Sequence, residues 1–121
     1  MMYRVAVGVV LVGFLTACSS STGPTTGSSG GSGTAVTIVS GASSRGSSAY
    51  SPNPLTITSG TTVTWMNSDS VTHTSSSDTS GVFNSGNIPA GGNFSFTFQT
   101  KGTVNYHCSI HPGMIGSIVV Q

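Results

Sequence analysis

Apolar side chains recur at every second position in short runs between residues 34 and 121, and this alternation limits the folds open to the chain. Side chains two residues apart lie on one face of a β-strand, whereas a helix needs a spacing of three or four. No long amphipathic helix is evident, so the pattern predicts strands with one buried face. The runs contain Val36 and Ile38, Leu55 and Ile57, Val63 and Trp65, Phe94, Phe96 and Phe98, and Val104, Tyr106 and Cys108.

Several short strands at this spacing predict an all-β domain over residues 34–121. We expect a Greek-key antiparallel β-sandwich of two sheets, or a Greek-key barrel. The segment LTITSGTTVTWMN is expected to form two strands joined around Gly60. An immunoglobulin-type domain would need a second Cys before Trp65 within the domain, but the only other Cys is Cys18.

Residues 1–17 have the pattern of a signal peptide, because Arg4 precedes an apolar run from Val5 to Leu15. This run is too short to span a bilayer comfortably. It leads into LTAC, which resembles the lipobox of bacterial lipoproteins and implies cleavage before Cys18 and lipidation of that Cys. Two alternatives stay open: an ordinary signal peptide cut nearby, and a disulfide between Cys18 and Cys108.

Residues 18–33 are rich in Ser, Gly and Thr and have no periodicity, which predicts a flexible linker after the lipidated Cys. A coil of about 15 residues typically spans about 20 Å. Signal peptide, lipid and linker together predict an exported protein. We expect a membrane-anchored bacterial lipoprotein that faces the periplasm or the cell exterior.

Charged residues are scarce, at 4% of the chain, and the formal net charge is +1. Nothing in this composition predicts a nucleic-acid partner. Without the signal peptide, the remaining charges are those of Arg45, Lys101, Asp69 and Asp78, which sum to zero. We expect a monomer whose contacts with protein partners depend only weakly on salt.

Soft metal donors gather in the segment YHCSIHPGM, which spans residues 106–114. Cys108, His111 and Met114 follow one another at intervals of three, and the Pro-Gly pair between the last two predicts a turn. Thiolate, imidazole and thioether suit copper, and a second His would complete a His2Cys site with an axial Met. Zinc is the competing metal, but zinc sites rarely include Met and usually contain more than one Cys.

Two histidines, His73 and His107, are candidates for the missing ligand. Alternation puts His107 on the opposite face of its strand from Cys108, so we expect it to lie outside the site. His73 can then complete the site from another strand. Met66 points away from the face of Trp65 and is expected to pack rather than to bind metal.

Other functional classes fit the sequence less well. A Cys-His nucleophile would need an orienting acid, and the chain has only two acidic residues, Asp69 and Asp78. A multicopper oxidase would need many more than three histidines. We therefore do not expect an enzyme, and a secreted sandwich whose donors bind nothing is the plain structural alternative.

Two segments resemble the small blue copper proteins of the plastocyanin and amicyanin group. YSPNPLTITSGTTVTWMNSDSVTH is similar to the family's run from an aromatic-x-Pro segment to its first His ligand. YHCSIHPGMIGSIVVQ is similar to its ligand loop and last strand. The resemblance spans nearly all of residues 34–121 and implies a cupredoxin-like sandwich that transfers single electrons. Its implied copper ligands are His73, Cys108, His111 and, axially, Met114.

The same resemblance implies that redox partner proteins dock near the exposed ring edge of His111. Apolar loop residues such as Pro112 and Ile115 are expected to surround this edge. A copper carrier or buffer of the cell envelope, using the same ligands, is the alternative function.

The chain departs from the family at two positions beside the expected ligands. The family often has Asn directly after its first His and Pro directly before its second, where this chain has Thr74 and Ile110. Thr74 can still form a hydrogen bond to the ligand loop. Ile110 has a backbone N–H that Pro lacks, and we predict that it points at the Cys108 sulfur and raises the reduction potential.

Overall fold

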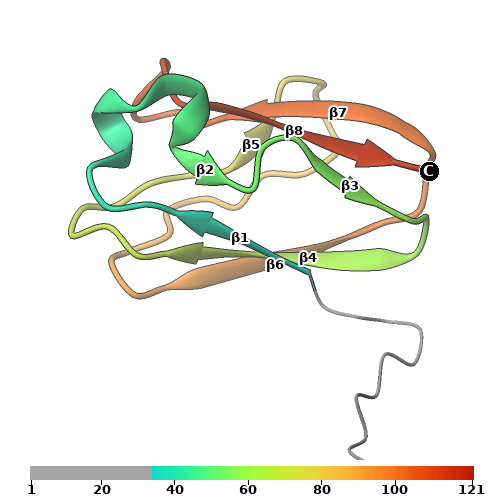
Figure 1. The fold of residues 1–121 in the computed structure, drawn as a ribbon, viewed down its shortest axis with the longest axis horizontal. Helices are drawn as coiled ribbons and strands as arrows, with labels where there is room; N and C mark the ends of the chain where they lie inside the picture. Colours follow the sequence, from blue (N-terminus) through green and yellow to red (C-terminus); the bar gives the residue numbers. More distant parts are fainter. Residues whose placement is uncertain (1–33) are drawn as a thin grey trace, which may run out of the picture.

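A computed structural model describes residues 34–121, and the predicted signal peptide (1–17) and linker (18–33) lie outside the described residues. The described part consists of two four-stranded sheets packed face to face (Figure 1). The first has the order β2-β1-β4-β6, formed by Tyr50–Ser51, Thr34–Ile38, Thr61–Asn67 and Asn93–Phe98. The second has the order β3-β8-β7-β5, formed by Leu55–Ile57, Ile115–Val120, Gly102–His107 and Ser76–Ser77.

Two short 3-10 helices, η1 (Ala42–Ser44) and η2 (Gly46–Ser48), connect β1 to β2. Within residues 34–121, no helix has both the length and the apolar character needed to cross a membrane.

The predicted β-sandwich is confirmed, and its sheets are mixed rather than purely antiparallel. Strands β1 and β4 run parallel, as do β3 and β8, while the other four strand pairs are antiparallel. Alternation could not distinguish these cases, because side chains have a period of two in strands of either direction.

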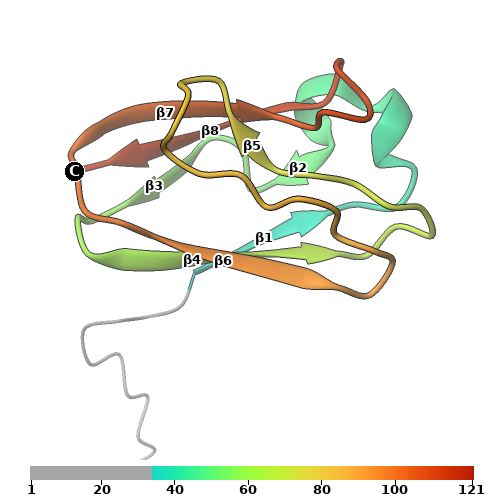
Figure 2. The same cartoon turned by 180° about the vertical axis from the view of Figure 1, so that it is seen from behind.

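The turn around Gly60 joins β3 to β4, as expected, but these strands lie in different sheets (Figure 2). Gly60 has a φ of 91°, a left-handed conformation that favours glycine. The N–H of Ser59 donates to the carbonyl of Gln121 at 2.9 Å, and that of Gly60 to the carbonyl of Phe98 at 2.7 Å. The turn is therefore tied to both sheets where the chain crosses between them.

The core between the sheets contains most of the alternating residues that the sequence singled out, and the others, Phe94, Phe96 and Val104, are partly buried and pack against it. Trp65 is fully buried, and its ring lies 5.5 Å from that of Tyr106 and 5.0 Å from that of Phe83, centroid to centroid. Because aromatic side chains bury large areas, this cluster contributes much of the hydrophobic stabilisation. Tyr106 reaches the cluster from β7, so the same strand that anchors the core also leads directly to Cys108.

Three connections meet at one end of the sandwich: the loop after β4, the loop between β7 and β8, and the segment with η1 and η2. The C-terminus lies at the opposite end (Figure 1). The candidate metal ligands are on the first two of these connections, so the topology brings them together from distant parts of the sequence.

Candidate metal centre

The candidate ligands come from two separately anchored parts of the backbone. His73 lies beyond the loop that follows β4, and it is held by a bridge in which its N–H and carbonyl bond to Ile88 at 3.1 and 2.8 Å. Cys108 directly follows β7. The loop that it begins is closed by the Cys108 N–H donating to the Met114 carbonyl at 3.0 Å and the Met114 N–H donating to the His111 carbonyl at 2.9 Å.

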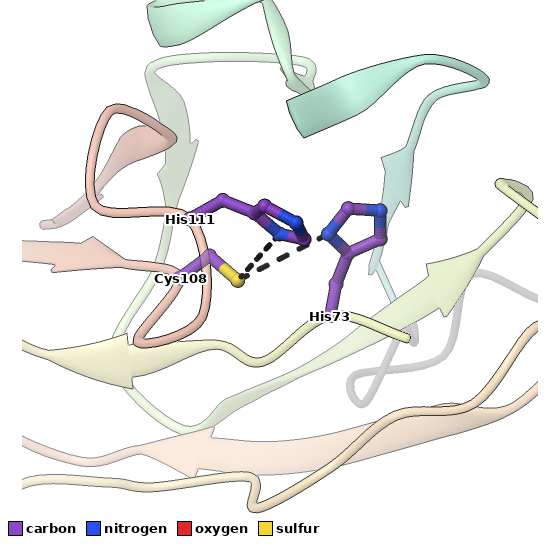
Figure 3. A group of neighbouring side chains, drawn as sticks. All are labelled: His73, Cys108 and His111. Atoms are coloured by element: carbon purple, nitrogen blue, oxygen red, sulfur yellow. Dashed lines mark hydrogen bonds between the residues drawn. The ribbon is translucent and has the colours of Figure 1, made fainter. Parts of the chain in front are cut away.

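The structure brings His73, Cys108 and His111 together (Figure 3). The Cys108 Sγ lies 3.7 Å from His111 Nδ1 and 4.0 Å from His73 Nδ1, and the three ligand atoms are all within 4.8 Å of one another. Metal bonds of about 2.0 Å to nitrogen and about 2.3 Å to sulfur place the donors of a planar trigonal site about 3.7 Å apart. The three donors are therefore spaced to share one ion.

Met114 lies at the end of the same loop and is fully buried, as are His73 and Cys108, whereas His111 is partly exposed. A soft thioether, two imidazoles and one thiol form the donor set of a type 1 copper site. The donor set and its burial fit copper, and the partial exposure of His111 leaves one ligand edge accessible from outside.

His107 lies outside the cluster, as strand alternation predicted. Its side chain is 37% exposed, and its Nδ1 lies 2.6 Å from the Asp78 carboxylate on the outer surface. Met66 points away from Trp65, but the expectation that it packs is wrong, because 49% of it is exposed. Both residues show that alternation predicts which face a side chain occupies, but not what lies on that face.

A backbone N–H does reach the Cys108 sulfur, but it belongs to Thr74 and not to Ile110. The Thr74 N–H donates to Sγ at 3.3 Å, while no hydrogen bond from Ile110 to this sulfur is found in residues 34–121. The prediction for Ile110 is therefore wrong. Ile110 is 47% exposed at the surface of the loop, and the hydrogen bond to the sulfur comes from the neighbouring connection instead.

Thr74 links the two ligand-bearing connections, as the sequence suggested. Its Oγ1 accepts a hydrogen bond from the Ser109 N–H at 2.7 Å, and its carbonyl accepts one from the buried Tyr50 hydroxyl at 2.6 Å. Through these bonds, a single residue next to His73 fixes the start of the loop that carries Cys108 and His111.

The sequence reasoning missed one residue at this site, Asp69. Its carboxylate Oδ2 lies 2.8 Å from His73 Nε2, on the side of the ring that faces away from Cys108. The hydrogen bond from His73, followed by those from backbone N–H groups, holds the pKa of Asp69 well below its usual range. A signal was present, since Asp69 is one of only two acidic residues in the chain and stands four positions before an expected ligand.

The two-sheet fold and this donor set define a type 1 copper protein of the cupredoxin class. A profile of the family described as "Copper binding proteins, plastocyanin/azurin family" matches residues 36–121, and the chain belongs to this family. The resemblance of residues 34–121 to the small blue copper proteins is therefore confirmed.

Individual relatives agree with this assignment. A plastocyanin from Scenedesmus fuscus is 36% identical over 104 residues, covering 71% of this chain and 99% of the relative. The structure of a purple cupredoxin from Nitrosopumilus maritimus has a TM-score of 0.68 and 35% identity, covering 73% of this chain and 99% of that one. The Cu(I) form of an amicyanin variant has a TM-score of 0.61 and 28% identity, covering 74% and 82% of the two chains.

Proposed function

We propose that this domain carries single electrons through one type 1 copper ion bound by His73, Cys108, His111 and Met114. The observation that carries the proposal is that two imidazole nitrogens lie 3.7 and 4.0 Å from the buried Cys108 sulfur, with all three donor atoms within 4.8 Å of one another. When bound there, copper supplies reversible exchange of one electron between Cu(II) and Cu(I). In this proposal the domain acts as an electron carrier rather than as an enzyme.

The chain's own contribution is to hold the ligands in one arrangement. His73 is fixed by its bridge to Ile88, and the ligand loop is fixed by its two internal hydrogen bonds and by Thr74. Ligands supported in this way move little when the charge of the ion changes, so electron transfer requires little rearrangement. The Thr74 N–H further stabilises the thiolate by donating to it.

Repeated redox cycling in the presence of a Cu(I) chelator tests the proposal against the copper carrier. We expect the blue absorption of the oxidised protein to return undiminished after each cycle, because pre-positioned ligands, three of them buried, retain the ion in both states. Loss of copper to the chelator on the first reduction would instead support a carrier or buffer.

We further propose that protein partners dock around the exposed edge of His111. This end of the domain is apolar: Ile110 and Ile115 are 47% and 50% exposed, and Val71 on the loop after β4 is 45% exposed. Of the four charged side chains expected in the mature protein, Asp69 is buried, which leaves few charges to steer a partner.

Electron self-exchange between oxidised and reduced copies measures docking at this patch without a known partner. We expect the rate to change by less than about twofold between ionic strengths of about 0.01 and 0.15 M, although the Debye length falls from about 30 to about 8 Å. A steep dependence of the rate on salt would show that charged groups dominate the contact.

The proposed location rests on the sequence of residues 1–33. The signal-peptide pattern and the LTAC segment support an exported lipoprotein anchored through Cys18, with the linker allowing the domain to move near the membrane surface. Mass spectrometry of the mature protein from a bacterial host should find a diacylated or triacylated Cys at the N-terminus. An unmodified N-terminus would remove this part of the proposal.

A further inference from the structure

The carboxylate of Asp69 is buried and fully engaged at the outer side of the metal centre. The residue is only 7% exposed. Its Oδ1 accepts hydrogen bonds from the N–H groups of Gly41 at 3.1 Å and Ser70 at 2.8 Å. Its Oδ2 accepts one from the N–H of Ala42 at 3.2 Å and lies 2.8 Å from His73 Nε2. The side chain thus joins the turn before η1, its own loop and the His73 ring.

This arrangement suits a carboxylate anion better than a neutral acid. The three backbone groups can only donate, and they direct their N–H bonds at both oxygens. Within residues 34–121, the only ion pair of Asp69 is the one with His73. A buried charge without a Lys or Arg partner is costly, so its retention beside a metal ligand calls for a functional reason.

The carboxylate also determines which nitrogen of His73 carries the ring proton. A carboxylate can only accept at Oδ2, so Nε2 must be the protonated nitrogen of the neutral ring. The lone pair is then on Nδ1, which is the atom that faces Cys108 Sγ at 4.0 Å. His73 is therefore held in the tautomer that binds a metal through Nδ1 before any ion arrives.

We propose that Asp69 is a positioning residue that holds His73 ready for copper and lowers the reduction potential of the site. A negative charge at Nε2 increases the electron donation from Nδ1, and this stabilises Cu(II) more than Cu(I). This inference rests on the proposed function, because it concerns the same ion and the same ligands.

The chain contains a matched control for this effect. Asp78 also lies against a histidine ring, with 2.6 Å between its Oδ1 and His107 Nδ1, but that ring is outside the site and the pair is exposed. Asp78→Asn and Asp69→Asn therefore remove the same charge from the same domain. Only the second of these variants changes a hydrogen bond to a ligand.

The decisive measurement is the reduction potential of the full chain carrying either substitution. Asp69→Asn replaces the carboxylate beside Nε2 with a neutral amide, so electron donation from Nδ1 falls and Cu(II) binding should weaken at least tenfold relative to Cu(I) binding. For a one-electron couple, this corresponds to a potential higher by at least about 59 mV. Asp78→Asn should change the ratio of affinities by less than twofold. Equal shifts in the two variants, or no shift in Asp69→Asn, would overturn the proposal.

A second measurement needs no variant and applies even if Asp69→Asn fails to fold. Nitrogen-15 NMR of the copper-free wild-type protein reports which nitrogen of the His73 ring carries the proton. We expect a proton on Nε2 that exchanges slowly with water, and a proton on Nδ1 would contradict the proposal. Failure of the wild type to form a blue copper site would instead refute the proposed function, so the two failures can be told apart.

Discussion

The Cys108→Ser variant should show none of the intense blue absorption that the wild-type protein develops on addition of Cu(II). That absorption arises from charge transfer between a copper ion and a thiolate, and Cys108 is the only Cys among residues 34–121. A Ser hydroxyl is a hard donor that stays protonated near neutral pH, so it cannot replace the soft thiolate. Visible absorption during titration with Cu(II) measures the difference directly.

His107→Gln is the matched control for this experiment. His107 is adjacent to Cys108 in the chain, but its ring pairs with Asp78 on the outer surface. Its replacement should leave the blue band at full intensity. The central claim fails if the wild type is colourless with Cu(II), or if Cys108→Ser keeps an intense band.

The Gly116→Ala variant should lose about 3 kcal/mol of the free energy of unfolding, at the upper end of the usual cost of overpacking a core. Gly116 on β8 lies directly opposite Tyr106 on β7, and a Cβ at position 116 would overlap the Tyr106 ring at Cε1, Cζ and Oη. That ring is fully buried against the rings of Trp65 and Tyr50, at centroid distances of 5.5 and 4.8 Å. A shift of this ring would disturb that packing on the strand that leads to Cys108.

Thermal unfolding of the copper-free protein measures this loss. A decrease of about 3 kcal/mol corresponds to a melting temperature lower by roughly 12 to 24 °C for a domain of this size. Gly113→Ala is the control, because nothing lies within 4 Å of a Cβ at that position and its φ is not in the left-handed region. Equal stability of the two variants would show that the core between β7 and β8 is looser than described.

The residues whose roles could be predicted from sequence are those determined by spacing along the chain. Cys108, His111 and Met114 occur at intervals of three, so one tight loop must present all of them. Trp65 and Tyr106 were expected in the core and His107 outside the site, because successive side chains of a strand must point to opposite faces. These conclusions depend only on local geometry.

The predictions that failed concerned contacts between segments far apart in the chain. Ile110 was expected to donate to the Cys108 sulfur because it is near in sequence, but the donor is Thr74, 34 residues away from Cys108. Asp69 was treated only as a charged residue, because its position near His73 did not reveal three backbone donors turned toward it. Met66 was expected to pack, but 49% of it is exposed on the outer face of β4.

By itself, the sequence determined that the chain forms a β-sandwich and that the loop of residues 106–114 presents the soft donors, because alternation and spacing act within a single strand or turn. Only the tertiary structure decided which strands run parallel, that Gly116 must make room for Tyr106, that Asp69 supports His73, and that the Thr74 N–H reaches the Cys108 sulfur. The physical reason is that hydrogen bonds and packing between distant segments depend on where the folded backbone brings them. The order of residues along the chain leaves those positions open.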